Sequence, residues 1–556
     1  MRILSILFST FLLLGLGTLK TVAREKAEHV VLIVWDGMRP DFVTPQYTPK
    51  LYQLAQRGTF FARNHCAYVS TTEVNGTVLA TGMHPEHSGI IANMEYRQDL
   101  NWLNAYGTEG LEIVRRGDSL SQGHYLQART VAELLHEAGI STVVAAAKTI
   151  GLLHDRAPGK VSQPEKDSVT LFRGESLPRR IVDSLVKAKD IGAFPVAEGL
   201  DTDSSIPAGR PKKSALAAST VSTNTSAADQ ISARAALANA IDSWTTKALV
   251  RGLWKNRIPK YSLLWLSEPD AAQHATGVGS DTAISALESS DDQLGALLQT
   301  LEEKDALETT DILVVSDHGF STIVRGPDVV ESLRKSGFNA AKQFKNPESG
   351  DILVDSLGGT IFFYVFEHDQ AIIQRLVTYL QGTDYAGVVF SRAPVEGAFR
   401  LEDVHLNATN GTPDVVVSMR WTSTENELGV PGLLAVMEGK AGQGSHGSLS
   451  PFDLHNTLIA AGPDFKKGFV SDVPSGNIDV APTILSILGI TPRAAMDGRV
   501  LTEAFVDAPP NLPKATERVM ESNRDVGFLS WHQFLKVTKV GSSVYFEEGN
   551  GGPRLK

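Results

Sequence analysis

Cysteine is nearly absent from the sequence, since Cys66 is the only one among 556 residues. A chain with one cysteine cannot form an internal disulfide, so its stability must come from a hydrophobic core and from any metals that it binds. We expect Cys66 to be a small buried residue. Hydrophobic residues make up 42% of the chain and charged residues 21%, which is ordinary for a globular enzyme with a large core.

Basic runs and long apolar segments are also missing. The chain shows no interleaving of basic with aromatic residues, and its formal net charge is −11. A nucleic-acid polymer is therefore not an expected partner. Beyond the N-terminus, no segment is long and apolar enough to predict a membrane-spanning helix. Internal repeats are absent as well, and the sequence does not indicate an oligomeric state.

Residues 1–23, MRILSILFSTFLLLGLGTLKTVA, have the pattern of an export signal. Arg2 precedes an apolar stretch of about 15 residues, and small residues follow it, as in signals that are cleaved during secretion. An uncleaved membrane anchor is the alternative, although the stretch is short for a span. We therefore expect an exported protein, periplasmic or secreted, with no stable membrane insertion after the signal is cleaved.

Strand-like and helix-like segments alternate along most of the chain. Apolar runs typical of buried strands occur at 29–35, 141–148, 261–266 and 311–316. The segment 281–304 carries apolar residues at helical spacing. This alternation predicts an α/β fold, with an α/β/α sandwich around a central, mostly parallel sheet. In such sheets the carboxyl ends of the strands form the rim of the active site.

Two stretches interrupt the alternation, and we expect them to be cap insertions near the site. One contains a Ser/Thr/Ala-rich tract, and the other is an irregular block with some core strands. The C-terminus alternates like a β-hairpin. The predicted organisation is an export signal at 1–23, a catalytic core at 24–158, 246–320 and 446–511, a partly mobile insertion at 159–245, the irregular block or cap at 321–445, and a C-terminal extension at 512–556.

Four segments far apart in the chain each end an apolar run with side chains that can bind metals. A further segment, YVSTTEVNG, supplies hydroxyls, and in it Thr72 lies three residues before Asn75. Three carboxylates and three imidazoles suffice for two three-ligand metal sites, with a hydroxyl available as nucleophile. A two-metal hydrolase with a covalent intermediate requires this set. The candidate ligands are Asp36, Asp270, His274, Asp317, His318 and His446.

Each candidate also has an ordinary structural explanation. An aspartate after a strand is often a turn or a helix cap, and Asp36 begins the turn-like DGMRPD. His446 lies between glycines and is by itself typical of a loop. Thr72 is placed to cap the helix that begins at Glu73, a role compatible with catalysis because helix N-termini favour phosphate. The ordered set, with each segment after an apolar run, favours a metal centre.

Four more histidines lie close to these motifs in the sequence: His65, His84, His87 and His455. We expect structural or supporting roles for them.

The segments VLIVWDGMRPD, STTEVNGTVLATGMHPEHSGI, PDAAQH, SDHG and GSHG, in this order, resemble the alkaline phosphatase superfamily. The nearest match is its nucleotide pyrophosphatase/phosphodiesterase branch. The resemblance implies two zinc ions per chain. One would be held by Asp270, His274 and His446, and the other by Asp36, Asp317 and His318. Zinc suits such mixed nitrogen and oxygen ligands, although manganese and iron are chemically allowed.

The resemblance also implies a catalytic role for Thr72. Its hydroxyl would coordinate the second zinc, which lowers the pKa of a bound hydroxyl, and would attack phosphorus to give a covalent phospho-threonine. Thr71 is the rival nucleophile, and the three-residue offset to Asn75 selects Thr72. Asn75, one helical turn later, would donate its amide to a non-bridging phosphate oxygen. The substrate would be a small-molecule phosphoester.

One departure from the branch bears on the substrate. Many members carry lysine immediately before the nucleophile, where this chain has Thr71. Monoesterases of the superfamily need an additional cation for the third charged phosphate oxygen, and Lys148 is the candidate for that role. Some of them have a Lys-x-Arg pair, whereas this chain reads Lys148-Thr149-Ile150. With half of the pair missing, we expect phosphodiesters, either of nucleotide type or other small diesters.

Other functions stay open at this point. A phosphomonoesterase would use Lys148 to bind the phosphate, and a phosphonate hydrolase would need the same metals and threonine. A sulfatase is disfavoured because the sequence has no Cys-x-Pro motif. A catalytically silent protein that binds phosphorylated ligands is the least expected, since every ligand type is intact.

Overall fold

The structure, a computed structural model, describes residues 27–157, 168–196, 227–408 and 411–556. The predicted export signal lies outside these ranges, and so does most of the Ser/Thr/Ala-rich tract. The prediction that the insertion is partly mobile concerns the same tract and also lies outside the described residues. Within the described ranges, no helix is long and apolar enough to cross a membrane.

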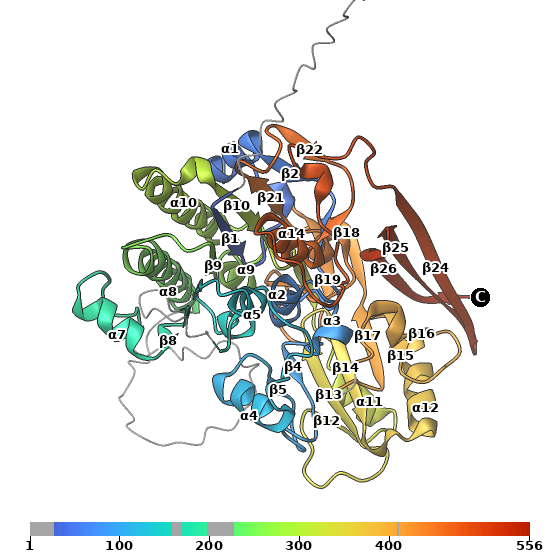
Figure 1. Ribbon diagram of the computed structural model, residues 1–556. Helices are drawn as coiled ribbons and strands as arrows, with labels where there is room; N and C mark the ends of the chain where they lie inside the picture. The colour runs from blue at the N-terminus through green and yellow to red at the C-terminus, as the bar shows by residue number, and fades with distance from the viewer. Residues whose placement is uncertain (1–26, 158–167, 197–226, 409–410) are drawn as a thin grey trace, which may run out of the picture.

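A nine-stranded sheet forms the centre of the fold (Figure 1). Its strands lie in the order β22 (Phe469–Ser471), β2 (Thr59–Phe61), β21 (Leu458–Ala461), β10 (Thr310–Val315), β1 (His29–Trp35), β9 (Tyr261–Leu266), β6 (Thr142–Ala146), β7 (Val169–Phe172) and β8 (Glu175–Leu177). The five strands from β10 to β7 are parallel neighbours. Nearly all their residues are buried, as expected when both faces of a parallel sheet are covered. The predicted, mostly parallel sheet is confirmed.

The register of the parallel strands determines where the site lies. Val34 of β1 pairs with Val315 of β10 on one side and with Trp265 of β9 on the other. Trp265 in turn pairs with Ala146 of β6. Four strands therefore end at the same level, and the residues that follow them meet along one carboxyl edge of the sheet.

Alternate residues of β1 face two separate cores. The even-numbered residues from Val30 to Val34 pack in one core and the odd-numbered residues from Val31 to Trp35 in the other, as the two-residue period of a strand requires. The first core is covered by α2 (Thr72–Thr81), α5 (Val131–Glu137) and α14 (Val480–Ile487), and the second by α1 (Pro49–Arg57) and α10 (Asp281–Glu303). Helices thus cover both faces of the sheet, which confirms the α/β/α sandwich (Figure 1).

Residues 321–445 are regular, and the prediction of an irregular block with some core strands is wrong. None of the strands that the structure describes in this block joins the central sheet. One sheet consists of β12 (Ala340–Ala341), β13 (Ile352–Leu357), β14 (Thr360–Val365), β17 (Val415–Met419), β15 (Ala386–Ser391) and β16 (Phe399–Arg400), and a second of β18 (Trp421–Glu425), β19 (Pro431–Ala435), β11 (Ser321–Arg325) and β20 (Gly444–Ser445). With α11 (Val329–Lys335) and α12 (Gln370–Gln381), these strands bury an apolar core of their own. The apolar runs are recognisable in the sequence, but their alternation does not tell which sheet they join.

The central sheet also extends into the predicted insertion. Strands β7 and β8 lie inside 159–245, yet they pair at one edge of the sheet. The helices α7 (Arg180–Lys187) and α8 (Ala227–Lys247) follow them. The apolar run of β7, VTLF, is too short and too closely flanked by polar residues to be recognised as a core strand. The predicted boundary at residue 159 therefore comes too early.

The C-terminal extension is a three-stranded antiparallel sheet. The predicted hairpin is present as β25 (Leu529–Val540) and β26 (Ser543–Leu555). The mostly exposed and polar β24 (Ala515–Val526) adds a third strand that the sequence pattern does not reveal. Leu535 and Phe546 of the hairpin share a core with Cys66, which is buried as predicted. The extension is therefore attached to the main body.

Candidate active site

The first candidate ligand group lies where β1 and β10 end. Asp36 directly follows β1, and Asp317 and His318 follow β10; all three are fully buried. The Nε2 atom of His318 is 3.6 Å from Asp36 Oδ1 and 3.4 Å from Asp317 Oδ2. The backbone N–H of Gly37 donates to Asp317 Oδ1 at 3.0 Å from a turn with a φ of +72°. The register of two parallel strands thus brings three of the six predicted ligands together.

The second group forms around the start of the helix that follows β9. Asp270 and His274 are four residues apart in α9 (Asp270–Thr276), and His446 directly follows β20. The Nε2 atoms of His274 and His446 lie 3.3 and 3.6 Å from Asp270 Oδ1, and 3.1 Å from each other. The ring of His446 stacks on that of His318 at 3.6 Å, so the two groups adjoin. All six side chains converge on one site.

Backbone carbonyls orient the three imidazoles. Each Nδ1 is within hydrogen-bond distance of a carbonyl oxygen: Gly444 for His274 (3.1 Å), Gly319 for His318 (2.9 Å) and Ser70 for His446 (2.8 Å). A carbonyl can only accept, so each Nδ1 carries the hydrogen and each neutral ring presents the lone pair of Nε2. All three Nε2 atoms face carboxylate oxygens. This is the orientation that metal-binding histidines have in proteins.

The carboxylates leave unsatisfied oxygens at the same point. Asp36 Oδ1, Asp270 Oδ1 and Asp317 Oδ2 are buried and have no hydrogen-bond partner within the described ranges. Burial and then the neighbouring Asp317 raise the pKa of Asp36 well above its ordinary value. Burial likewise raises the pKa of Asp317 to about 6. Unpaired oxygens that face nitrogen lone pairs require cations between them. The ligand atoms of Asp36, Asp317 and His318 lie within 4.8 Å of one another, and so do those of Asp270, His318 and His446. With His274 beside Asp270 and His446, the residues fit divalent metal ions of the zinc type.

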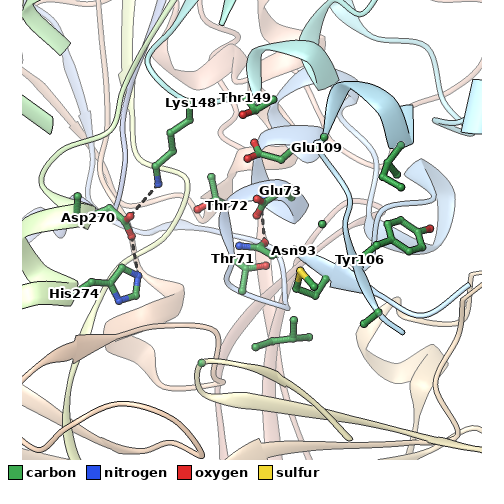
Figure 2. Close-up of a pocket in the computed structure, with 18 of the residues that line it drawn as sticks. Thr71, Thr72, Glu73, Asn93, Tyr106, Glu109, Lys148, Thr149, Asp270 and His274 are labelled. Carbon is green, nitrogen blue, oxygen red and sulfur yellow. Dashed lines mark hydrogen bonds and ion pairs between the residues drawn. The ribbon is translucent and has the colours of Figure 1, made fainter. Parts of the chain in front are cut away.

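Lys148 connects the two groups. It follows β6 on the same edge of the sheet, and its Nζ is 2.7 Å from Asp36 Oδ2 and 2.9 Å from Asp270 Oδ2 (the second contact is drawn in Figure 2). Burial alone would lower the pKa of Lys148, but Asp270 and Asp36 outweigh it and hold the pKa well above its ordinary value. Lys148 is thus in the site, where its charge is shared between two carboxylates.

Thr72 is the first residue of α2, and its Oγ1 is 3.4 Å from His318 Nε2. The helix N-terminus adds a partial positive charge and free backbone N–H groups at this point, which favour a phosphate group. Thr71, the preceding residue, also lines the cavity. Of the two hydroxyls, that of Thr72 lies against the first ligand group.

The prediction that Asn75 binds the substrate is wrong. Its side chain is fully buried, and the backbone N–H of Ala67 donates to its Oδ1 at 2.7 Å. Its Nδ2 lies 3.0, 3.2 and 3.3 Å from the carbonyl oxygens of Ala67, Val69 and Thr71. All its polar atoms are therefore committed to the backbone. One helical turn after Thr72, the side chain faces inward and secures the loop that leads into α2.

Asn93 is the amide that the sequence argument missed. It lines the cavity together with Thr72 and Lys148, and its Oδ1 accepts a hydrogen bond from the backbone N–H of Glu73 at 3.1 Å (Figure 2). Within the described residues no hydrogen bond is found for its Nδ2, which remains available to a ligand. Asn93 reaches the start of α2 from a separate loop, so no local spacing links it to Thr72.

A cavity of about 1990 Å³ opens onto these groups. Thr72, Lys148 and Asp270 lie on its inner wall, and aromatic side chains including Trp102, Tyr106 and Phe194 line other parts of it. The cavity exceeds the size of a typical small-molecule site, so it accommodates considerably more than a phosphate group. Aromatic faces of this kind suit planar groups such as nucleobases.

Residues 30–448 match the family described as type I phosphodiesterase / nucleotide pyrophosphatase. The chain belongs to this family. The match spans the six candidate ligands. It confirms the nucleotide pyrophosphatase/phosphodiesterase branch that the sequence motifs predicted. No curated protein sequence is found to match the chain.

Solved structures of two related proteins share the fold. Murine ectonucleotide pyrophosphatase/phosphodiesterase 5, solved as an inactive threonine-to-alanine variant in complex with AMP, has a TM-score of 0.51 and 16% identity, over 83% of this chain and 95% of that one. The human protein of the same name has a TM-score of 0.53 and 16% identity, over 86% of this chain and all of the other. These similarities confirm the α/β fold.

We predict that Asn93 and Asn75 have separable roles. Replacing Asn93 with alanine removes a donor from the cavity and should lower kcat for phosphodiester hydrolysis roughly 100-fold. The loss of its hydrogen bond from the Glu73 N–H should cost only about 1 kcal/mol of stability. Asn75→Ala, the matched control, should lower the free energy of unfolding by about 1–3 kcal/mol, because it leaves buried backbone groups unpaired. Steady-state kinetics and urea unfolding distinguish the two, and full turnover in Asn93→Ala would contradict the assignment.

A second prediction concerns Asp317 in metal-free protein. Its pKa of about 6 lies above the ordinary value of 3.8, so ionised Asp317 destabilises the fold above about pH 6, and this effect disappears as the pH falls toward 4. Asp317→Asn, which resembles the protonated acid, should therefore stabilise the metal-free protein by about 1–3 kcal/mol at pH 8 and have little effect at pH 4.5. Urea unfolding at the two pH values measures this. The same variant should lose most of the stabilisation that added zinc confers on the wild type, and equal stabilisation of both would argue against a ligand role.

Proposed function

We propose that the chain is a two-zinc hydrolase that cleaves small phosphodiesters of nucleotide type through a phospho-threonine at Thr72. The observation that carries the proposal is the placement of the Thr72 hydroxyl at a helix N-terminus, beside two adjoining groups of metal-type ligands. Membership of the type I phosphodiesterase / nucleotide pyrophosphatase family supports the reaction class. The murine relative, inactive as a threonine-to-alanine variant and solved with AMP, supports both the nucleophile and the ligand class.

Asp36, Asp317 and His318 would hold one metal ion, and Asp270, His274 and His446 the other. Zinc in these positions supplies positive charge for the phosphate oxygens and lowers the pKa of a bound hydroxyl. The ligand atoms agree with this assignment, since unpartnered carboxylate oxygens face imidazole Nε2 atoms in both groups.

The reaction consists of two successive displacements at phosphorus. The Thr72 oxygen attacks phosphorus in line, a Thr72 Oγ1–phosphorus bond forms, and the bond to the leaving oxygen breaks, which releases the first alcohol or nucleotide product. The partial positive charge at the start of α2 and the Nδ2 amide of Asn93 stabilise the non-bridging oxygens while negative charge develops. Water then attacks phosphorus, the Thr72 Oγ1–phosphorus bond breaks, and a proton from the water returns to Thr72 Oγ1. The second product, which carries the water oxygen, is released.

The environment of Lys148 supports diesters over monoesters. A monoester dianion carries a third charged oxygen that needs a cation of its own, and the ammonium of Lys148 is already held by Asp36 and Asp270. Ile150, at the position where some monoesterases have arginine, is fully buried against Gly76 of α2 and provides no charge. A phosphomonoesterase is the second candidate, because Lys148 also lines the cavity.

The activity test is the ratio of kcat/KM for a nitrophenyl diester to that for the matching monoester, on zinc-loaded protein. We expect the diester to be preferred about 100-fold, which is roughly 2.7 kcal/mol of transition-state discrimination. Thr72→Ala should reduce diester turnover to the uncatalysed background, whereas the neighbouring Thr71→Ala should retain most of it. A monoester preference would overturn the diester proposal, and activity in Thr72→Ala would overturn the nucleophile.

Lys148→Ala separates the two candidate functions. If Lys148 only balances the charge of Asp36 and Asp270, both activities should fall by a similar factor, about tenfold, and their ratio should stay constant. If Lys148 binds the third oxygen of a monoester, monoester turnover should fall selectively, by about 100-fold or more. Parallel measurement of kcat/KM on the two esters gives the answer, and we expect the constant ratio.

A further inference from the structure

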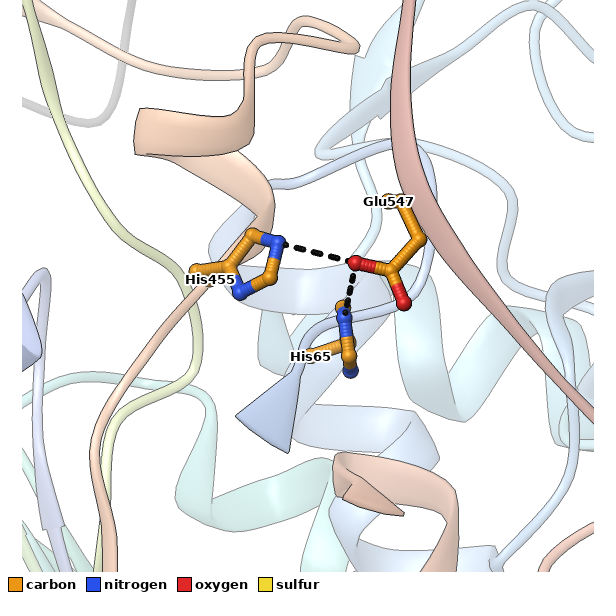
Figure 3. Close-up of side chains that lie close together, drawn as sticks. All are labelled: His65, His455 and Glu547. Atoms are coloured by element: carbon orange, nitrogen blue, oxygen red, sulfur yellow. Dashed lines mark ion pairs between the residues drawn. The ribbon is translucent and has the colours of Figure 1, made fainter. Parts of the chain in front are cut away.

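A second cluster of metal-type side chains lies outside the active-site cavity (Figure 3). It consists of His65 in β3 (Asn64–His65), His455 directly after α13 (Pro451–Leu454), and Glu547 in β26. Glu547 Oε2 is 3.2 Å from His65 Nε2 and 3.4 Å from His455 Nε2. None of these residues belongs to the two ligand groups described above.

The hydrogen-bond partners of His65 leave one nitrogen unsatisfied. Its Nδ1 is 2.9 Å from the carbonyl oxygen of Ser475, so Nδ1 carries the hydrogen and a neutral ring presents the lone pair of Nε2. This Nε2 is buried, has no hydrogen-bond partner within the described ranges, and faces the carboxylate of Glu547. A lone pair that faces a carboxylate oxygen is repelled by it unless a cation lies between them. The side chain of His65 is fully buried, so water does not relieve the repulsion.

The other oxygen of Glu547 already has partners. Arg63 Nη2 and Thr538 Oγ1 each lie 2.6 Å from Oε1. Burial raises the pKa of Glu547, but the adjacent imidazoles of His455 and His65 outweigh burial and hold the pKa well below its ordinary value. Glu547 is therefore an ionised carboxylate, with Oε1 satisfied and Oε2 directed between two imidazoles.

The distances and the exposure match a zinc site. Tetrahedral zinc with bonds of about 2.0–2.2 Å separates its ligand atoms by about 3.3–3.5 Å, close to the 3.2 and 3.4 Å found here. The three ligand atoms all lie within 4.8 Å of one another. The side chain of His455 is 29% exposed, so an ion can reach the cluster from solvent and a water molecule can complete its coordination.

We propose that His65, His455 and Glu547 form a third metal site, which binds a divalent transition-metal ion of the zinc type and fastens the C-terminal sheet to the body of the protein. This assignment gives a specific form, a structural metal site, to the structural or supporting roles expected for the two histidines. The site joins β3, the residue that follows α13, and the last strand, β26. No disulfide links these segments, because the chain has a single cysteine. Such a crosslink stabilises the folded state by the free energy of metal binding.

The site is structural because it is separated from the reacting groups. Asn456, which follows His455, hydrogen-bonds to Asn477, and Asn477 Nδ2 donates to the backbone oxygen of Asp317 at 2.8 Å. The ion therefore supports the backbone behind a candidate ligand but does not contact the cavity. Loss of the ion should lower the melting temperature much more than kcat.

The test counts zinc per chain by mass spectrometry after equilibrium dialysis. In a background with two ligands removed from each active-site group (Asp36→Asn, His318→Gln, Asp270→Asn and His274→Gln), we expect one zinc per chain, and none when His455→Gln is added. In the otherwise wild-type chain, His455→Gln should remove one zinc and lower the zinc-dependent rise in melting temperature, while diester kcat changes less than twofold. His368→Gln is the matched control, since His368 also pairs with a carboxylate (Asp414, 2.8 Å) but has no second imidazole beside it.

A cobalt experiment makes the outcome independent of how the cluster variants fold. Cobalt(II) added to the chain with the disabled active site should give the visible absorption of a tetrahedral ion, and its absence would overturn the proposal. Unchanged zinc content in His455→Gln, in both backgrounds, would also overturn it and identify the cluster as a protonated hydrogen-bonded pair. Because the background has no functional active site, a failure of the proposed two-zinc hydrolase does not affect this result.

Discussion

Repulsion among three buried carboxylates is the constraint on which the site depends. Asp36, Asp270 and Asp317 lie within one cluster at the carboxyl edge of the central sheet, where charges interact strongly because little water screens them. Lys148 compensates part of this charge by bridging two of the carboxylates. Backbone carbonyls accept hydrogen bonds from the Nδ1 atoms of the three imidazoles, so that each Nε2 faces inward toward the carboxylates. The remaining negative charge and the unsatisfied oxygens make the site a receptor for divalent cations.

The site is rigid because its residues lie at the ends of strands and at the starts of helices. Asp36 and Asp317 directly follow strands of one parallel sheet, while Asp270 and Thr72 are the first residues of helices. Their backbones are held by the hydrogen bonds of regular structure, so the ligand geometry exists before any ion binds. At Gly319 a β-carbon would lie 2.1 Å from the carbonyl oxygen of Phe452, so only glycine can follow the histidine there.

The sequence predicted the parts of the site that carry a local signal. Asp36, Asp317 and His318 follow apolar strands, and strand register then brings Asp36 and Asp317 together, so this ligand group could be inferred without coordinates. His446 follows a polar, glycine-rich segment and carries no such signal. The asparagine that faces the cavity could not be inferred in this way. Asn75 and Asn93 are the same residue type, and the packing of α2 decides which of them lines the cavity. Strand pairing in β14 and β17 could not be predicted either. The sequence shows that both segments are apolar, but it does not show which strands they pair with. His65, His455 and Glu547 come from three separate regions and share no pattern at all.

The position of β21 has a consequence for how the chain folds. This strand, at Leu458–Ala461, inserts between β10 and β2, which precede it by a large part of the sequence. Until β21 has been synthesised, β10 keeps an unpaired edge, and β2 has no neighbour through which to join the sheet. Such an edge is prone to pair with other chains, so the newly made protein is vulnerable to aggregation until β21 has been synthesised and has paired. The sheet that carries Glu547 follows β21 in the chain, so the C-terminal sheet can be attached only after β21 has been synthesised.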